Sequence, residues 1–161
     1  MRPVWALLAA AAGACAPADT GMLEPVVLEV RFVDPAPEPG SLRLPVRGST
    51  DRLAVGSDLL LTGADLADVQ VQPTPLSTLL PPGTEALNEV TLILTPDGAS
   101  RLGRAIAGRT GRRLAVVLDG EVVAQPMIRG PLSEGVVVLA EDFSQREAQA
   151  IALELERARR P

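Results

Sequence analysis

The side chains of this sequence that could do chemistry are carboxylates, and the most prominent is Asp119, in the run LAVVLDGEVVAQPMI. Histidine is the usual general base near neutral pH, and none of the 161 residues is a histidine. Two further acid pairs occur, Asp65 with Asp68 and Glu141 with Asp142. Acids beside helix starts and turns are ordinary surface residues. We therefore expect no catalytic residue, and a carboxylate-based hydrolase is the least favoured hypothesis.

Metal, cofactor and nucleic-acid sites have no support in the sequence either. Without histidine, and with Cys15 as the only cysteine, the usual zinc ligands are missing. No EF-hand spacing or phosphate-binding glycine loop occurs. The 20 acidic residues outnumber 15 arginines, which gives a net charge of −5 and no basic field for a nucleic-acid backbone. We expect no metal, no cofactor and no nucleic-acid partner.

Asp119 has a sufficient explanation as a turn residue. Asp119 and Gly120 separate two β-branched runs, and a tight two-residue hairpin turn requires positive φ at both of its positions. We therefore interpret this pair as a structural turn. Because Pro126 has no N–H for a strand ladder, we expect the returning strand, 121–128, to lie at a sheet edge or to carry a bulge.

The N-terminal residues are typical of an export segment. Arg2 precedes an apolar run that is much shorter than the roughly 20 residues of a membrane-spanning helix. Small residues then precede Cys15 in the pattern of a cleavage site. We expect a signal peptide at 1–14, a tether at 15–24 and a single domain at 25–161.

Cys15 is the expected lipid-attachment site. A lone thiol in an oxidising envelope has no intramolecular partner, and a lipid on its sulfur removes that reactive group. The alternative is an ordinary secretory signal with an incidental cysteine. Ala16 after the cysteine resembles outer-membrane sorting in some bacteria. The expected location is therefore the periplasm-facing cell envelope, at the outer membrane, with the lipid anchor as the only membrane contact.

The rest of the sequence predicts an α+β fold with a mainly antiparallel sheet and two helices packed on one face. Thr95-Pro96-Asp97 is a helix start, and Ser144 and Glu147 have capping-box spacing before a last helix. Strands are predicted at 25–34, 88–95, 112–119, 121–128 and 136–140, with short strands possible at 42–47 and before residue 73. Segments 35–57 and 73–87 are otherwise left without assignment.

Several motifs in one order resemble the periplasmic region of SecD, an accessory subunit of the bacterial protein-export channel, and specifically its head subdomain. They are LTGADL at 61–66, VTLILTPDGA at 90–99, LAVVLDGEVVAQPMI at 114–128 and the helix pattern between Phe143 and Leu155. The resemblance covers most of residues 26–155 and implies a ferredoxin-like-related α+β domain. The sequence departs from the family at Ala124-Gln125, at Glu141 and in the 73–83 loop.

The resemblance also implies contact with other polypeptides. SecD couples proton flow to export through acids in its membrane helices, and we expect this chain to lack that motor. The favoured hypothesis is a non-enzymatic, membrane-tethered periplasmic binding module for translocating or unfolded polypeptide or an envelope partner. A structural or assembly lipoprotein that shares only the fold is the alternative.

The candidate contact surface has two parts. One is the loop with Thr62 and Leu66; the other is the predicted edge strand, with Val122, Ala124, Pro126 and Ile128. An exposed strand edge can capture a peptide by strand addition. Protection of that edge from aggregation explains Pro126 equally well.

Overall fold

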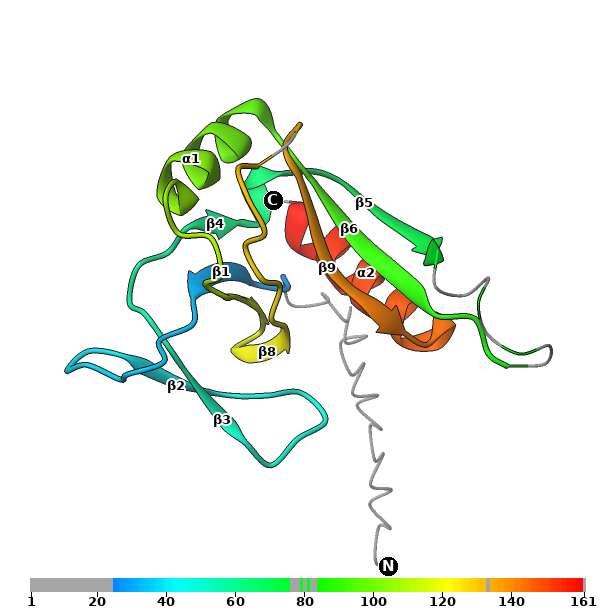
Figure 1. Ribbon diagram of the computed structural model, residues 1–161, viewed down its shortest axis with the longest axis horizontal. Coiled ribbons are helices and arrows are strands. Elements are labelled where there is room, and N and C mark those ends of the chain that lie inside the picture. Colours follow the sequence, from blue (N-terminus) through cyan, green and yellow to red (C-terminus); the bar gives the residue numbers. More distant parts are fainter. Residues whose placement is uncertain (1–24, 76–78, 80, 82–83, 133, 161) are drawn as a thin grey trace, which may run out of the picture.

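The computed structural model describes residues 25–75, 79, 81, 84–132 and 134–160, so Cys15, the predicted signal peptide and the predicted tether lie outside the described residues. The α+β class is confirmed (Figure 1). The strands are β1 (Leu28–Phe32), β2 (Leu42–Pro45), β3 (Arg52–Val55), β4 (Leu61–Thr62), β5 (Leu66–Pro73), β6 (Asn88–Leu94), β7 (Leu114–Leu118), β8 (Glu121–Ala124) and β9 (Val136–Phe143). The helices are α1 (Pro96–Ile106), α2 (Gln145–Arg159) and a 3-10 turn, η1 (Gly63–Asp65).

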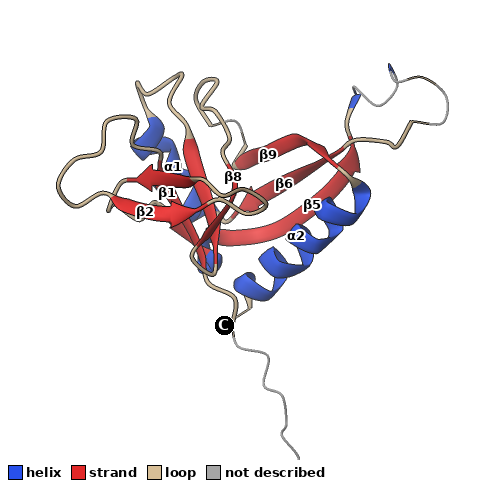
Figure 2. Cartoon of the chain, turned by 90° about the horizontal axis from the view of Figure 1, so that it is seen from below, coloured by secondary structure: helices blue, strands red, loops and turns tan. Residues whose placement is uncertain are grey.

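The strands divide among three sheets instead of forming one. A four-stranded sheet has the order β4-β1-β7-β8, a three-stranded sheet has the order β5-β6-β9, and β2 pairs with β3. Every pairing between these strands is antiparallel, as the sequence predicts. Helix α2 packs on the β5-β6-β9 sheet and also contacts β1. The ends of the described chain consequently lie on one side of the molecule, where β1 begins and α2 ends (Figure 2).

Strand β7 lies between two hydrophobic clusters, which explains why its sequence is apolar at both alternations. All five of its residues are buried. Val116 belongs to the main core, which extends over both larger sheets and both helices. Ala115 and Val117 point to the other face, where they pack with Val55 and Val122 beneath the β2–β3 hairpin. A strand covered on both faces needs apolar residues at every position.

Both helices begin at the predicted caps. The Thr95 hydroxyl accepts a hydrogen bond from the Gly98 N–H at 3.2 Å, ahead of α1. The Ser144 hydroxyl accepts from the Glu147 N–H at 3.3 Å, and the Glu147 carboxylate accepts from the Ser144 N–H at 3.0 Å. Such caps satisfy N–H groups that have no partner inside the helix. Within the described residues, neither helix is long and apolar enough to cross a membrane.

The β2–β3 hairpin occupies the segment 35–57, where the sequence predicts only a short strand at 42–47 and no second strand corresponding to β3. Arg47, just beyond β2, forms ion pairs with Glu121 of β8 at 3.2 Å and with Glu154 of α2 at 2.9 Å. Its main-chain N–H donates to the Val122 carbonyl at 2.9 Å. Strand β8 is therefore the last strand of its sheet, but the hairpin covers its outer edge at Val122.

Candidate functional site

The loop with Thr62 and Leu66 forms a structural junction. The Asp65 carboxylate, which is 5% exposed, accepts hydrogen bonds from the Thr62 N–H at 2.8 Å and from the Thr62 hydroxyl at 3.2 Å. Asp65 also pairs with Arg101 of α1, and its carbonyl accepts from the Thr95 N–H at 2.8 Å. These bonds attach the start of β5 to α1.

The same loop is pressed against α2. A Cβ at Gly63 would overlap the main-chain carbonyl of Ala158, so only glycine fits there. Leu66 is 4% exposed, and Thr62 is partly buried. The residues of this loop join β4, α1 and α2. Because Leu66 is buried there, the structure gives no support to the predicted contact of its side chain with a partner.

The predicted contact residues of the second hairpin strand are also buried. Val122 is 1% exposed and packs in the cluster beneath the β2–β3 hairpin. Ala124 is 8% exposed and belongs to the main core. Side-chain contact through these two residues is therefore unsupported in the folded protein. Pro126 and Ile128 are buried too, but they line a surface groove and remain next to a surface that a partner could reach.

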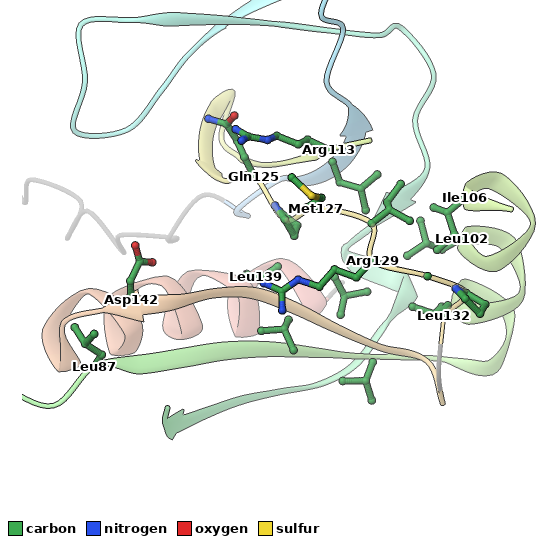
Figure 3. Close-up of a pocket in the computed structure, with 18 residues that line it drawn as sticks. Leu87, Leu102, Ile106, Arg113, Gln125, Met127, Arg129, Leu132, Leu139 and Asp142 are labelled. Carbon is green, nitrogen blue, oxygen red and sulfur yellow. The ribbon is translucent and has the colours of Figure 1, made fainter. Parts of the chain in front are cut away.

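That groove, here called the β9 groove, lies between β9 and the segment 125–132, with a volume of about 630 Å³ (Figure 3). Leu102 and Ile106 of α1 close one end, beside Leu132, and Leu87 lies at the other. Large apolar side chains are exposed along it: Met127 is 49% exposed, and Val136 and Val138 are each 38% exposed. Exposed apolar residues gathered at a groove indicate a binding surface more strongly than scattered ones.

The charges in the β9 groove differ in sign from the balance of the whole chain. Its charged lining residues are Arg113, Arg129 and Asp142, a formal charge of +1, whereas the chain carries −5. Figure 3 shows Arg129 reaching toward β9 beside Leu139, and Asp142 at the end near Leu87. Of the two arginines, Arg113 is exposed and forms no ion pair within the described residues.

Most of the residues that line this groove are not predicted as contact residues from the sequence. Arg113, Met127, Arg129, Val136 and Val138 were not among the candidate contact residues. The available signal was the run VVV at 136–138, which is apolar at both alternations although β9 is an edge strand. An edge strand with apolar residues on both faces leaves some of them uncovered.

Asp119 and Gly120 turn the chain from β7 to β8, with φ of 48° and 81°. The Asp119 carboxylate also accepts a hydrogen bond from the Val27 N–H at 2.8 Å, and the Asp119 N–H donates to the Val27 carbonyl at 3.0 Å. These two bonds extend the pairing of β1 with β7. Asp119 is exposed, and its bonds to Val27 join residues too far apart in the sequence for a local pattern to predict them.

A surface hollow of about 580 Å³ brings Asp119 near one other acid, Glu29. The Glu29 carboxylate pairs with Arg31 at 2.9 Å, so the two acids do not share one uncompensated site. The Asp65 carboxylate is not available to act together with Asp68, because it is bonded to Thr62 and Arg101 in the junction described above. Within the described part of the chain, no group of three or more acids or cysteines could hold a metal ion.

The sequence matches the family described as SecDF, P1 head subdomain, over residues 41–158. The protein translocase subunit SecDF of Thermus thermophilus is 38% identical over 96 residues, which are 60% of this chain and 12% of that protein. The subunit SecD of Aquifex aeolicus is 31% identical over 110 residues, 68% of this chain and 20% of that protein. The chain thus spans a small part of these relatives.

Solved structures agree with the sequence comparison. A crystal structure of SecDF in its super-membrane-facing form matches with a TM-score of 0.63 and 28% identity, over 83% of this chain and 19% of that chain. A structure of SecDF described as a membrane component that enhances protein export matches with a TM-score of 0.61 and 29% identity, over 83% of this chain and 63% of that one. This chain belongs to the SecDF P1 head subdomain family.

Proposed function

We propose that this chain is a periplasmic module of protein export that contacts translocating or unfolded polypeptide in the β9 groove. The observation that carries the proposal is a groove of about 630 Å³ with exposed Met127, Val136 and Val138, in a chain whose relatives include protein translocase subunits. An unfolded polypeptide exposes apolar side chains, and a partly apolar groove lowers the free energy of those side chains by removing them from water.

The test is photocrosslinking in intact cells. A photoreactive amino acid replaces Val138 in the groove, and the matched control carries it at Gln70, an exposed residue of β5 on the other edge of the same sheet. We expect crosslinks from position 138 to many different exported proteins during their export, and few from position 70. Equal yields from the two positions would contradict the proposal.

The alternative hypothesis, a structural or assembly component of the envelope, predicts a different result in that experiment. Its signature is one abundant envelope protein crosslinked at position 138, independent of ongoing export. Blocking export before irradiation separates the two hypotheses, because only contact with translocating polypeptide disappears with the flow of substrate.

A non-enzymatic role is part of the proposal. It is supported by the exposed position of Asp119, by the ion pair that engages Glu29 and by the use of Asp65 in the loop junction. A general acid or base needs a partner within hydrogen-bond reach and a site that limits water, and these carboxylates are placed otherwise. The Asp119→Asn variant is expected to retain the crosslinking pattern of the unmodified chain.

We also propose that Cys15 carries a lipid and that this anchor holds the domain at the periplasmic side of the envelope, at the outer membrane. Mass spectrometry of the purified protein tests the first point through a lipid-sized mass increase on the N-terminal peptide. Fractionation tests the second: the Cys15→Ser variant should leave the membrane fraction, and the unmodified chain should sediment with outer-membrane markers. An unmodified Cys15 thiol at the N-terminus would refute the anchor.

A further inference from the structure

We propose that the β9 groove holds an extended, acidic segment of polypeptide that adds as a strand to the outer edge of β9. This inference rests on the proposed function and specifies the backbone geometry and charge of the bound segment. Both walls of the groove have main-chain groups that bond to no other main chain within the described residues, and charged side chains line the groove.

The outer edge of β9 has a main chain free to pair. Strand β9 is the last strand of its sheet, and among the described residues it pairs with β6 alone. Within the described residues, the main chain of Val136–Phe143 makes no hydrogen bond to other main-chain groups beyond its pairing with β6. Register is regular at Val136, Val137 and Val138 and shifts after them, so the regular part of the edge is also the part with exposed valines.

The opposite wall offers main-chain groups as well. The Leu114 N–H donates to the Pro126 carbonyl at 2.9 Å, and the Ile128 N–H donates to the Arg112 carbonyl at 2.8 Å. In an antiparallel pair, the residue between two such bonding positions turns its own N–H and C=O to the other side. That residue is Met127, so its main-chain groups point away from β7, and they bond to no other main chain within the described residues.

Charge favours an acidic occupant. Arg113 is exposed and lines the groove, and no ion pair holds its guanidinium within the described part of the chain. Arg129 also lines the groove, beside Leu139, but it already has an interaction partner of its own (Figure 3). Asp142 lies at the end near Leu87, so the occupant should have its carboxylates near Arg113 and its apolar residues against β9. A strand of about four residues spans roughly 13 Å, which suits the short regular edge.

The direct test measures peptide binding to the full chain. Two peptides of about seven residues share alternating valine and threonine, and one ends in two aspartates where the other ends in two lysines. At low salt, we expect the acidic peptide to bind about tenfold more tightly, and added salt should reduce that difference. Equal affinity of the two peptides would overturn the charge assignment.

A second measurement isolates strand addition from side-chain contact. N-methylation of alternate amides removes the hydrogen-bond donors of one peptide edge and leaves every side chain in place. Methylation of the edge that faces β9 should weaken binding about tenfold or more, and methylation of the other edge should weaken it less. Equal loss, or no loss, in both methylation patterns would overturn strand addition.

Variants of the protein test the role of Arg113. Arg113→Gln should weaken the preference for the acidic peptide about fivefold, as expected for one exposed ion pair. Arg43→Gln is the matched control, because Arg43 is an exposed arginine of β2 that does not line the groove. An equal effect of both substitutions would show a general charge effect and overturn the role of Arg113.

The outcomes separate this inference from the proposed function. Crosslinks to exported proteins at position 138, together with binding that ignores N-methylation, would keep the proposed function and overturn strand addition. No peptide binding and no crosslinks would overturn both. A second copy of this chain is the other possible occupant of the β9 edge, and a dimer in sedimentation that persists with saturating acidic peptide would overturn the proposal.

Discussion

The two edges of the β5-β6-β9 sheet differ in how they are protected. At β5, the exposed side chains include Gln70 and Gln72, the strand ends at Pro73, and Arg159 of α2 donates a hydrogen bond to the Ala67 carbonyl. At β9, the exposed side chains include Val136 and Val138, and the main chain beside them is unpaired within the described residues.

The difference indicates which edge is available to a partner. Polar side chains, proline and a bulge are common ways to keep an edge from pairing with another chain, and β5 has all three, with its bulge between Leu66 and Asp68. The first half of β9 has none of them. A groove borders that half, and this is why we propose a single extended chain as its occupant.

The largest expected effect comes from the junction that fixes the start of β5. Gly63→Ala should lower the free energy of unfolding by about 3 kcal/mol, because the added Cβ would collide with the main chain of Ala158. Urea denaturation measures the change. Gly103→Ala in α1 is the control: nothing lies within 4 Å of its Cβ position, and a gain of about 0.5–1 kcal/mol is expected. Equal stability of the two variants would contradict the role of Gly63.

A slightly smaller loss is expected for Asp65→Ala. The substitution leaves the Thr62 N–H and the Arg101 guanidinium without their carboxylate, at a cost of about 2 kcal/mol. Asp68→Ala, three residues further on, should change the free energy of unfolding by less than about 0.5 kcal/mol. Thermal and urea unfolding of both variants checks the contrast, and similar losses would argue against a junction specific to Asp65.

The end of β9 is secured by the cap of α2, and breaking that cap should cost less. Ser144→Ala removes the hydroxyl that accepts from the Glu147 N–H, at a cost of about 1 kcal/mol. Faster hydrogen exchange in the first turn of α2 is the local readout. Unchanged exchange there would count against the cap.

The same cap carries a pH dependence. Hydrogen bonds from the Ser144 hydroxyl, and then from its N–H, hold the pKa of the Glu147 carboxyl below its ordinary value of 4.5. A lowered folded-state pKa contributes stability above the unfolded-state pKa, and this contribution disappears as the pH falls through the folded-state value. The stability difference between the unmodified chain and Ser144→Ala should therefore shrink below about pH 4.5. A difference that stays constant at acid pH would contradict this account.

The smallest effect on stability should accompany a large effect on binding. Val138→Lys places a charge on an edge residue that is 38% exposed, so the free energy of unfolding should change by about 0.5 kcal/mol. Its affinity for an uncharged valine–threonine peptide should nevertheless fall about tenfold, because edge lysines oppose strand addition. Gln70→Lys on β5 should leave affinity unchanged. Equal affinity of the two variants would remove the proposed distinction between the edges.

Local patterns predicted the elements well, because each depends on neighbours in sequence. Thr95 and Ser144 cap the helices, and Asp119 with Gly120 turns the hairpin, through bonds or φ values decided within a few residues. The division into three sheets depends instead on contacts between distant segments. The Arg47 ion pair with Glu154, for example, joins residues 107 positions apart.

The candidate contact surface is harder to predict for the same reason. Val122 and Ala124 follow the alternation of an exposed strand, but the β2–β3 hairpin buries Val122 and the main core buries Ala124. Arg113 precedes β7 and Val138 belongs to β9, and only the folded chain places both beside one groove. Burial of Leu66 follows from Gly63 and Asp65, whose partners lie in α2 and α1.

The closeness of the start of β1 to the end of α2 has a consequence for domain architecture. A folded unit whose two ends leave from one side can be inserted into a longer polypeptide without disturbing its sheets. This agrees with the solved SecDF chain in which the matching region is 19% of the total length. The same geometry lets flanking segments of any length hold the unit while its β9 edge stays open to the surroundings.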